Sequence, residues 1–187
     1  MAWNVSGSGG FFHLDPEIYT MRILPFALLA WTSLAPISAM ASEADFLKSI
    51  EGQWSGGGTV LTKLGGDNVG VTCKMKSSAN AANLAMDGSC RALVVVTRSF
   101  TARVKATGVS YSGTYIGVSG KPSTLQGSRN ANTLNLNVTW ASIIYGDNKA
   151  LMTIQKVGTD GLRIRTLDKD PQSGKSVVTT DLRLKRT

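Results

Sequence analysis

Two cysteines, Cys73 and Cys90, are the residues of this 187-residue chain whose type and spacing most clearly predict chemistry. They lie in the segment NVGVTCKMKSSANAANLAMDGSC, where residues on one face alternate with polar ones on either side of a loop near Asn80–Asn83. In a hairpin symmetric about that loop, the two cysteines stand directly opposite each other. Opposed residues have Cα atoms about 4.5–5.5 Å apart, within reach of a disulfide. We therefore predict a disulfide, with two buried free thiols as the alternative.

An export signal precedes this hairpin. Met21 and Arg22 are followed by the apolar run ILPFALLAWTSLAPI, and Ala39 and Ala41 fit the small-x-small pattern of a cleavage site. The run is shorter than the about 20 residues that a membrane-spanning helix needs. We expect a signal peptide at residues 21–41 and an upstream extension at residues 1–20, a true N-terminal tail being the alternative. The mature protein would then be one domain, residues 42–187, periplasmic or secreted in a bacterium.

Few residues of the mature chain could catalyse a reaction. Removing residues 1–41 removes His13, the only histidine, and raises the formal net charge from +8 to +9, because that segment holds one basic and two acidic residues. Without histidine, a His-activated nucleophile is excluded, and with both cysteines oxidised the usual zinc and iron ligands are missing. We expect no enzymatic activity and no metal or other cofactor. Several acids fall in predicted turns, where we expect solvated side chains: Asp67, Asp147, Asp160, Asp168 and Asp170.

The elements that position these residues are predicted to be strands. Phe46, Leu47 and Ile50 share one face of a short N-terminal helix, and the remainder alternates with a period of two, as in TLNLNVTW at residues 133–140. About 8–10 strands joined by turns predict an all-β fold, an antiparallel up-and-down barrel with a β-sandwich as the alternative. Besides the cysteine hairpin and residues 133–140, the predicted strands include residues 94–105, 108–118, 123–129, 149–157, 161–167 and 176–186.

Arg98 lies on the apolar side of its strand, between Val96 and Phe100, where an unpaired charge is costly. It would either hold the carboxylate or phosphate of a bound molecule, or stand at the barrel mouth or against an acid or carbonyl partner. Tyr111, Tyr115 and Trp140 are candidates to line the same cavity, although aromatic side chains on one strand face are also typical of a plain core.

Basic residues are spread along the strands, on what we expect to be the outer face. They favour contact with an anionic component of the cell envelope, such as lipid head groups or acidic polysaccharides, or serve solubility alone. Export, and the scattered aromatic residues, argue against nucleic acid as a partner. The residues concerned are Lys74, Lys76, Arg103, Lys105, Arg163, Arg165 and Lys185.

The opening of the mature chain resembles a known family. Gly52-Gln53-Trp54, after a helical turn and at the start of the first strand, is similar to the Gly-x-Trp motif of lipocalins and the wider calycin barrels. In that family an arginine near the end of the last strand packs over the tryptophan. The resemblance assigns that role to Arg186, with Arg183 as the second choice, and implies a barrel that holds a small ligand.

Two further resemblances are partial. GQW followed by two cysteines resembles the periplasmic metalloprotease inhibitors of the Inh type, but the interval from Trp54 to Cys73 is too long and the match ends after Cys90. The stretch WSGGG resembles the haem-binding nitrobindin-like barrels, which ligate iron through histidine. Because the mature chain has no histidine, haem ligation does not follow.

These observations lead to three functional hypotheses. The first is an exported barrel that binds a small apolar or amphipathic molecule, or supports the cell envelope through such binding. The alternative is a protease inhibitor or protein-interaction module that works through residues 42–50 and adjacent loops. A third is purely structural association with the envelope, without a ligand. A cavity inside the barrel would favour the first hypothesis over the other two.

Overall fold

The computed structural model describes residues 37–93 and 95–187. The upstream extension and residues 21–36 of the expected signal peptide lie outside these residues, while its last five residues begin helix α1. The elements are α1 (Ile37–Ser49), β1 (Gly52–Leu61), β2 (Asn68–Asn80), β3 (Asn83–Ala92), β4 (Val96–Thr107), β5 (Ser110–Ile116), β6 (Pro122–Asn130), β7 (Thr133–Ile144), β8 (Asp147–Val157), β9 (Gly161–Lys169) and β10 (Ser176–Arg186).

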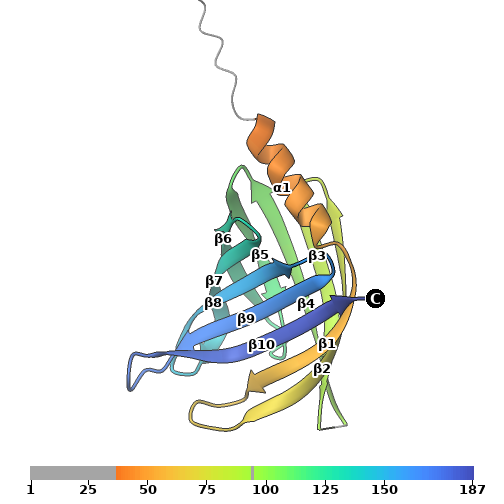
Figure 1. Cartoon of the computed structure of the whole chain (residues 1–187). Helices are drawn as coiled ribbons and strands as arrows, with labels where there is room; N and C mark the ends of the chain where they lie inside the picture. The colour runs from red at the N-terminus through yellow and green to blue at the C-terminus, as the bar shows by residue number, and fades with distance from the viewer. Residues whose placement is uncertain (1–36, 94) are drawn as a thin grey trace, which may run out of the picture. The chain divides into compact units, whose positions relative to one another are not determined.

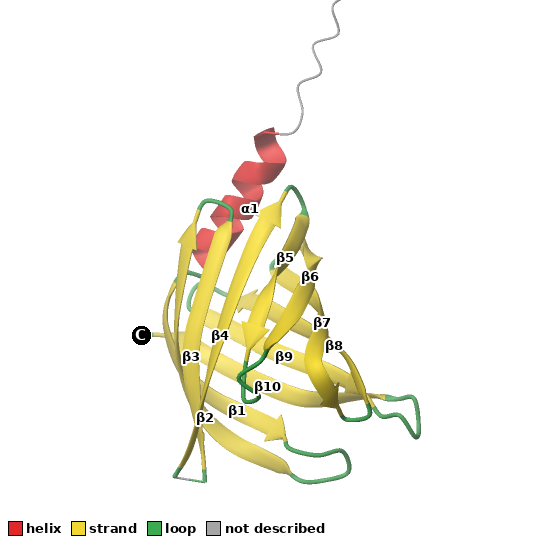
Figure 2. Ribbon diagram, turned by 180° about the vertical axis from the view of Figure 1, so that it is seen from behind, coloured by secondary structure: helices red, strands yellow, loops and turns green. Residues whose placement is uncertain are grey.

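The ten strands form one closed antiparallel barrel (Figures 1 and 2). Each strand pairs with its neighbour in the sequence, and β1 pairs with β10 from Trp54 opposite Arg186 to Val60 opposite Thr180. This closure confirms the predicted up-and-down barrel and excludes the sandwich. It also leaves none of these ten strands with an unpaired edge, and such edges favour aggregation in a chain so rich in strands. No helix in the described part of the chain is long and apolar enough to cross a membrane.

The alternation read from the sequence determines which side chains enter the barrel. In β9, for example, Leu162, Ile164, Thr166 and Asp168 are buried while the residues between them are less buried. Two strands interrupt this period: the pairing of β10 with β9 shifts between Val178 and Thr180, and that of β7 with β8 shifts after Thr139. Such irregularities redirect side chains locally, and both lie near the cavity described below.

The barrel has a closed end and an open end. Because the topology is up-and-down, the β2–β3, β4–β5, β6–β7 and β8–β9 turns share one end, and the other five connections share the opposite one. Helix α1 lies against the first group (Figures 1 and 2). We call this end of the barrel the closed end, and the opposite end the open end.

The last residues of α1 and the residue that follows it seal the closed end. Phe46, Leu47 and Ile50 are buried, as predicted from their spacing. The Trp54 indole N–H donates to the carbonyl oxygen of Ile50 and to Ser77 Oγ, at 3.2 and 2.9 Å. These apolar contacts and hydrogen bonds connect the helix to both β1 and β2.

A buried ion pair also holds α1 against the barrel. The Glu43 carboxylate accepts from Arg129 Nη2 at 2.7 Å and from Arg129 Nε at 2.8 Å, and it accepts a hydrogen bond from the Tyr111 hydroxyl. Arg129 lies at the end of β6, 86 residues away in the sequence. Hydrogen bonding to Arg129 lowers the pKa of Glu43 below its ordinary value, against the opposing effect of burial.

Glycines let β1 and β10 close the ring. Gly56 and Gly58 lie on the same inward face of β1 as Trp54. A Cβ at Gly56 would overlap the carbonyl oxygen of Arg183 on β10, and a Cβ at Gly58 would overlap that of Asp181. The WSGGG stretch therefore serves a close approach of two backbones.

The arginine expected to pack over Trp54 does so. Arg186 is paired with Trp54 in register, and its guanidinium carbon lies 4.4 Å from the ring centroid. Arg186 Nη2 also donates to the Ser49 carbonyl oxygen at 2.8 Å, at the end of α1. Arg183 instead faces outward, near Asp181.

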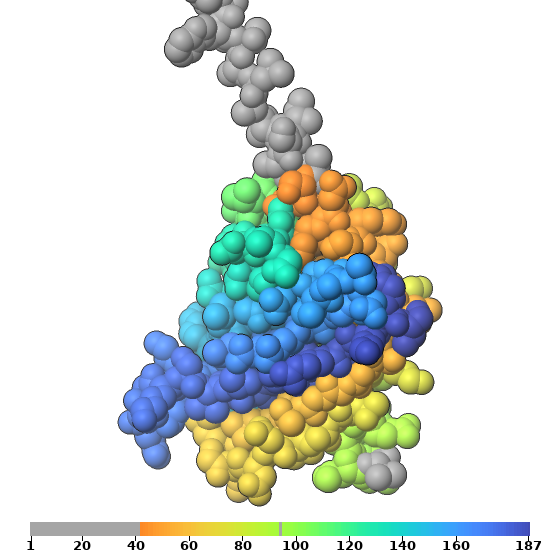
Figure 3. Space-filling view, in the orientation of Figure 1, coloured from red at the N-terminus to blue at the C-terminus, as the bar shows by residue number. Residues whose placement is uncertain are grey.

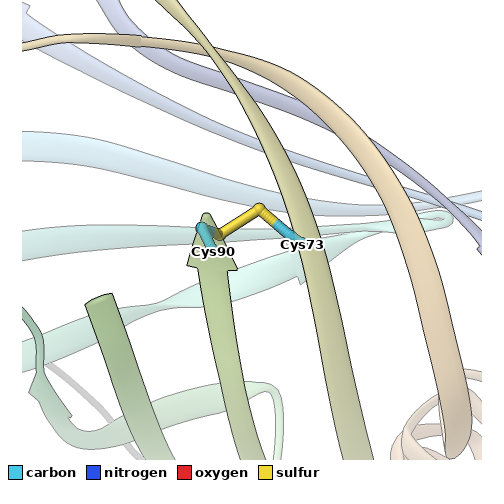
Figure 4. Close-up of a disulfide and its surroundings, with 2 residues drawn as sticks. All are labelled: Cys73 and Cys90. Carbon is cyan, nitrogen blue, oxygen red and sulfur yellow. A yellow bond between two sulfur atoms is a disulfide. The ribbon is translucent and has the colours of Figure 1, made fainter. Parts of the chain in front are cut away.

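The predicted disulfide is present. Cys73 and Cys90 are directly paired between β2 and β3, with Cα atoms 4.0 Å apart (Figure 4). The hairpin turns between Asn80 and Asn83, as the symmetry argument requires. Cys73 is buried and Cys90 lines the cavity, so the bond lies on the inner side of the barrel wall.

Replacing Arg129 tests the ion pair at the closed end. Arg129→Met leaves the Glu43 carboxylate buried without a positive partner, and we expect the free energy of unfolding at pH 7 to fall by about 2–3 kcal/mol. A carboxyl whose pKa is lowered by folding stabilises above its ordinary pKa of 4.5 and loses that contribution as pH falls through the lowered value. The difference between wild type and variant should therefore shrink in acid.

Urea unfolding at pH 7 and pH 3 measures both effects. Arg103→Met, which removes an exposed ion pair with Asp87, is the matched control and should change stability by less than about 1 kcal/mol. An Arg129→Met variant as stable as this control would contradict the role given to the ion pair.

Removing the disulfide tests how far the hairpin depends on it. The bond joins residues 17 apart in the sequence, so the Cys73→Ala, Cys90→Ala double variant should lose about 3 kcal/mol. Reduced wild-type protein should lose a similar amount in the same urea titration. Unchanged stability in both samples would show that the strand pairing needs no covalent support.

Candidate ligand-binding cavity

A cavity of ≈ 790 Å³ occupies the open-end half of the barrel. Its wall is mostly apolar and comes from strands all round the barrel, because every strand contributes inward-facing residues. Cavities of this volume are in the range that holds small organic ligands. Representative apolar residues of the wall are Val71, Met86, Phe100, Met152, Ile154 and Leu182.

Three of the four predicted ligand-binding residues line this cavity. Tyr115 lies between Phe100 and Trp140, with ring centroids 6.4 and 6.0 Å apart, so the three rings form one aromatic wall. Burial raises the pKa of the Tyr115 hydroxyl. Arg98 lines the cavity near the β3–β4 turn and is exposed, which is the mouth position that the sequence left open as an alternative.

Tyr111 does not belong to the cavity wall. It faces the interior in β5, as Tyr115 does, but it lies at the closed end, where its hydroxyl donates to Glu43 of α1. Burial, followed by the bond to the Glu43 carboxylate, raises the pKa of Tyr111. Its role in this structure is to anchor the helix.

Asp168 is a polar cavity residue that the sequence interpretation missed. The prediction of a solvated turn residue is wrong: Asp168 lies within β9, faces inward and is only 2% exposed. Its Oδ1 accepts from the Trp140 indole N–H at 3.1 Å, and its Oδ2 accepts from the Thr179 hydroxyl. The alternation of Leu162, Ile164 and Thr166 contains the signal, because it continues to residue 168.

Local irregularities bring the partners of Asp168 into place. The shift in register between Val178 and Thr180 accompanies the inward turn of Thr179, which is buried. Ala150 of β8 is paired with both Val138 and Asp168, and the hydrogen bond from Trp140 of β7 to Asp168 of β9 crosses this strand. A buried carboxyl is thus held in a fixed position on the cavity wall.

No basic side chain in the described residues forms an ion pair with Asp168. Burial raises the pKa of Asp168 above its ordinary value, the hydrogen bonds from Thr179 and Trp140 oppose this, and the charge of Asp147 adds to it. A buried carboxylate with two hydrogen bonds and no cation is costly to keep charged.

Tyr145 lines the cavity close to Asp168. It lies in the β7–β8 turn with a positive φ of 57°, and its hydroxyl donates to the carbonyl oxygen of Leu61 at the end of β1. Burial, followed by the negative charge of Asp168, raises the pKa of Tyr145. The link spans the open ends of β9 and β10, which lie between β8 and β1 in the ring.

The basic residues expected outside the barrel are exposed or half-buried. Arg163, Arg165 and Arg183 surround Asp181, with nitrogen-to-oxygen distances of 2.6, 3.8 and 3.8 Å, so part of their charge is neutralised. Hydrogen bonding to Arg163 lowers the pKa of Asp181. Lys74, Lys76, Lys105 and Lys185 are exposed on strands β2, β4 and β10.

Comparisons with known proteins show the fold. No protein-family model matches the chain, and no curated protein matches it. Among solved structures the chain is similar to Rv2717c from M. tuberculosis, with a TM-score of 0.60 and 14% sequence identity over 82% of this chain and 99% of that one. At this identity the likeness supports the barrel architecture, while membership of the calycin or Inh-type families is not shown.

The isosteric variant Asp168→Asn tests the state of the buried carboxyl. A carboxyl whose pKa is raised by folding stabilises most below its ordinary pKa of 3.8 and loses that contribution as pH rises through the raised value. An amide has no such loss and keeps an acceptor for Trp140. We therefore expect the variant to unfold at higher urea concentration than wild type at pH 7, and to gain less or nothing at pH 3.

Trp140→Phe serves as a control, because it removes one donor to Asp168 and should lower stability at pH 7. An Asp168→Asn variant that is less stable than wild type at pH 7 would show that the carboxylate itself holds the wall together.

Proposed function

We propose that this protein is an exported, non-enzymatic binding protein for a small amphipathic molecule with an apolar body and an anionic group. The observation that carries the proposal is the ≈ 790 Å³ cavity, with its apolar and aromatic wall and Arg98 at its mouth. An apolar body would enter the barrel, and its carboxylate or phosphate would pair with the Arg98 guanidinium at the water-exposed end.

The placement of Arg98 supports this division of roles. The guanidinium is exposed and appears in no ion pair among the described residues, so it is available to an anion without first breaking an internal contact. Cys90, its partner in register on β3, is held by the disulfide to β2, which steadies this part of the wall. The disulfide also fits an oxidising compartment, in keeping with a periplasmic or secreted location.

The alternative, a protease inhibitor acting through residues 42–50, has less support. An inhibitor of that kind needs a free N-terminal segment, whereas Glu43, Phe46, Leu47 and Ile50 are buried against the closed end of the barrel. Using the segment on a protease would remove it from the closed end of the barrel and expose these side chains. A panel of bacterial metalloproteases assayed with the purified protein tests this alternative directly.

Titration with dodecanoate, a single-chain carboxylate, tests ligand binding. We expect saturable binding that changes Trp140 fluorescence, because Trp140 lines the cavity. Arg98→Met should weaken binding about tenfold, since one charge-assisted hydrogen bond to the ligand is lost. Calorimetry provides the dissociation constants.

Arg103→Met is the matched control, because Arg103 lies on the same strand but faces outward. It should bind dodecanoate as wild type does. If wild type binds neither dodecanoate nor dodecyl phosphate, the proposed function is wrong. If Arg98→Met and Arg103→Met lose affinity for dodecanoate equally, Arg98 has no specific role in binding the anionic group.

A further inference from the structure

Two charged side chains stand on opposite walls of the cavity. Arg98 belongs to β4 and Asp168 to β9, and these strands are five positions apart in either direction round the ring. Arg98 is exposed at the mouth, whereas Asp168 is buried. The cavity therefore has a positive side in contact with water and an acidic group inside.

Asp168 has acceptor capacity that the protein does not use. A carboxylate has about four acceptor positions, and this one accepts one bond from Trp140 and one from Thr179. The neighbouring polar hydroxyl of Tyr145 is directed to Leu61 instead. A purely apolar chain packed against Asp168 would leave its remaining lone pairs, and any charge, without a partner.

We infer that Asp168 selects a bifunctional ligand, whose anionic group pairs with Arg98 and whose second group, an ammonium or hydroxyl, donates to Asp168. This inference rests on the proposed ligand-binding function and narrows its substrate class. The ligand is an apolar spacer with an acid at one end and a hydrogen-bond donor at the other. Wild-type protein accepts the stability cost of a buried carboxyl because the ligand completes its hydrogen bonds.

The experiment compares straight-chain ω-aminoalkanoates with the unsubstituted alkanoates of the same length, using calorimetry on the full barrel at pH 7. The ω-amino compound should bind about tenfold more tightly than its partner at one preferred chain length, because a charged hydrogen bond is gained there. The preference for the ω-amino compound should decrease at both shorter and longer chain lengths, since Arg98 and Asp168 are held at a fixed separation by their strands.

Variants separate the two anchors. Asp168→Asn should abolish the gain from the amino group and leave binding of the plain alkanoate unchanged or stronger. Arg98→Met should weaken both compounds and leave the gain in place. Asp87→Asn, an exposed acid on the outer face of β3, is the control and should behave as wild type.

The outcomes distinguish this inference from the proposed function. If the plain alkanoates bind and the amino group weakens binding at every length, the inference is wrong and the proposed function stands. The inference is also wrong if Asp168→Asn keeps the gain. If neither the alkanoates nor the ω-aminoalkanoates bind, the proposed function is wrong, and the inference that rests on it is wrong as well.

A second, independent observation concerns the outside of the open end. The β3–β4 and β5–β6 connections are adjacent in the ring and expose large apolar side chains, with Leu93, Val95 and Val118 at 73%, 83% and 75% exposure. The β3–β4 hairpin projects from the barrel at the lower edge of Figures 1 and 3. We call these three residues, with Val96 and Ile116, the apolar rim.

The charged residues within the two segments that form the apolar rim are all positive. Arg91, Arg98 and Lys121 are exposed next to it, and no acidic residue occurs in residues 91–98 or 116–122. The acids of the open end, Asp67 and Asp147 among them, belong to other connections. Projecting apolar side chains flanked by bases are the pattern of a surface that enters an anionic lipid interface.

We propose that the apolar rim docks on an anionic lipid surface, with the cavity mouth facing the membrane. Charge complementarity favours this occupant over a second copy of the chain, whose rim would bring like charges together. The cavity opens beside the rim, since Leu93, Val96 and Val118 also line it. An amphipathic molecule could then pass between membrane and barrel without crossing water.

Cosedimentation with vesicles tests docking, using equimolar phosphatidylcholine and phosphatidylglycerol against phosphatidylcholine alone. Wild type should bind the anionic vesicles, and the Leu93→Asp, Val118→Asp double variant should lose most of this binding. The Val109→Asp, Val157→Asp double variant adds the same two negative charges at exposed valines of the closed end, so it is the matched control and should bind as wild type does.

Loss of binding in the control double variant to the same degree would assign the effect to net charge and would contradict docking through the apolar rim. If wild type binds neither type of vesicle, the docking proposal is also wrong. If wild type dimerises with increasing concentration and the Leu93→Asp, Val118→Asp variant does not, the rim binds a second copy of the chain instead.

Discussion

Closure of a ten-strand sheet is the constraint from which the other features of this protein follow. A barrel of about eight strands is just filled by its own side chains, and each added strand widens it. Ten strands enclose more space than the inward-facing residues of this chain occupy. The chain fills one end with α1, Trp54 and Tyr111, and the surplus volume remains at the other end as the cavity.

The two ends of the barrel each hold a buried carboxyl group, and the two groups differ in their partners. At the closed end, Glu43 is paired with Arg129 and Tyr111, and the contact stabilises the fold. At the open end, Asp168 has only neutral hydrogen-bond donors among the described residues and a raised pKa, so we expect it to weaken the fold at neutral pH. Groups that cost stability are typical of functional sites, which is why Asp168 points to a ligand more strongly than Glu43 does.

Much of the fold could be predicted from the sequence because strand alternation and turn chemistry are local. The symmetry of one hairpin placed Cys73 opposite Cys90, and a single motif placed Arg186 over Trp54. Alternation also identified which faces of β5 and β7 point inward. It could not give depth along the barrel, so Tyr111 was grouped with Tyr115 although the two lie toward opposite ends.

The missed residues depend on long-range geometry. Arg129 and Glu43 are paired although they lie 86 residues apart in the sequence, and no local sequence pattern predicts that pair. Asp168 was assigned to a turn because residues 168–174, DKDPQSG, are rich in turn-forming residues, and the predicted strand ended at residue 167. In the barrel, pairing with β8 and β10 extends β9 to Lys169 and buries the carboxyl.

The central claim, that the barrel holds an amphipathic molecule, is tested most directly by native mass spectrometry of the protein purified from its natural host. A retained organic molecule that carries an acidic group and is released on unfolding is the predicted result. A bare protein that also takes up no amphiphile when one is added would contradict the claim.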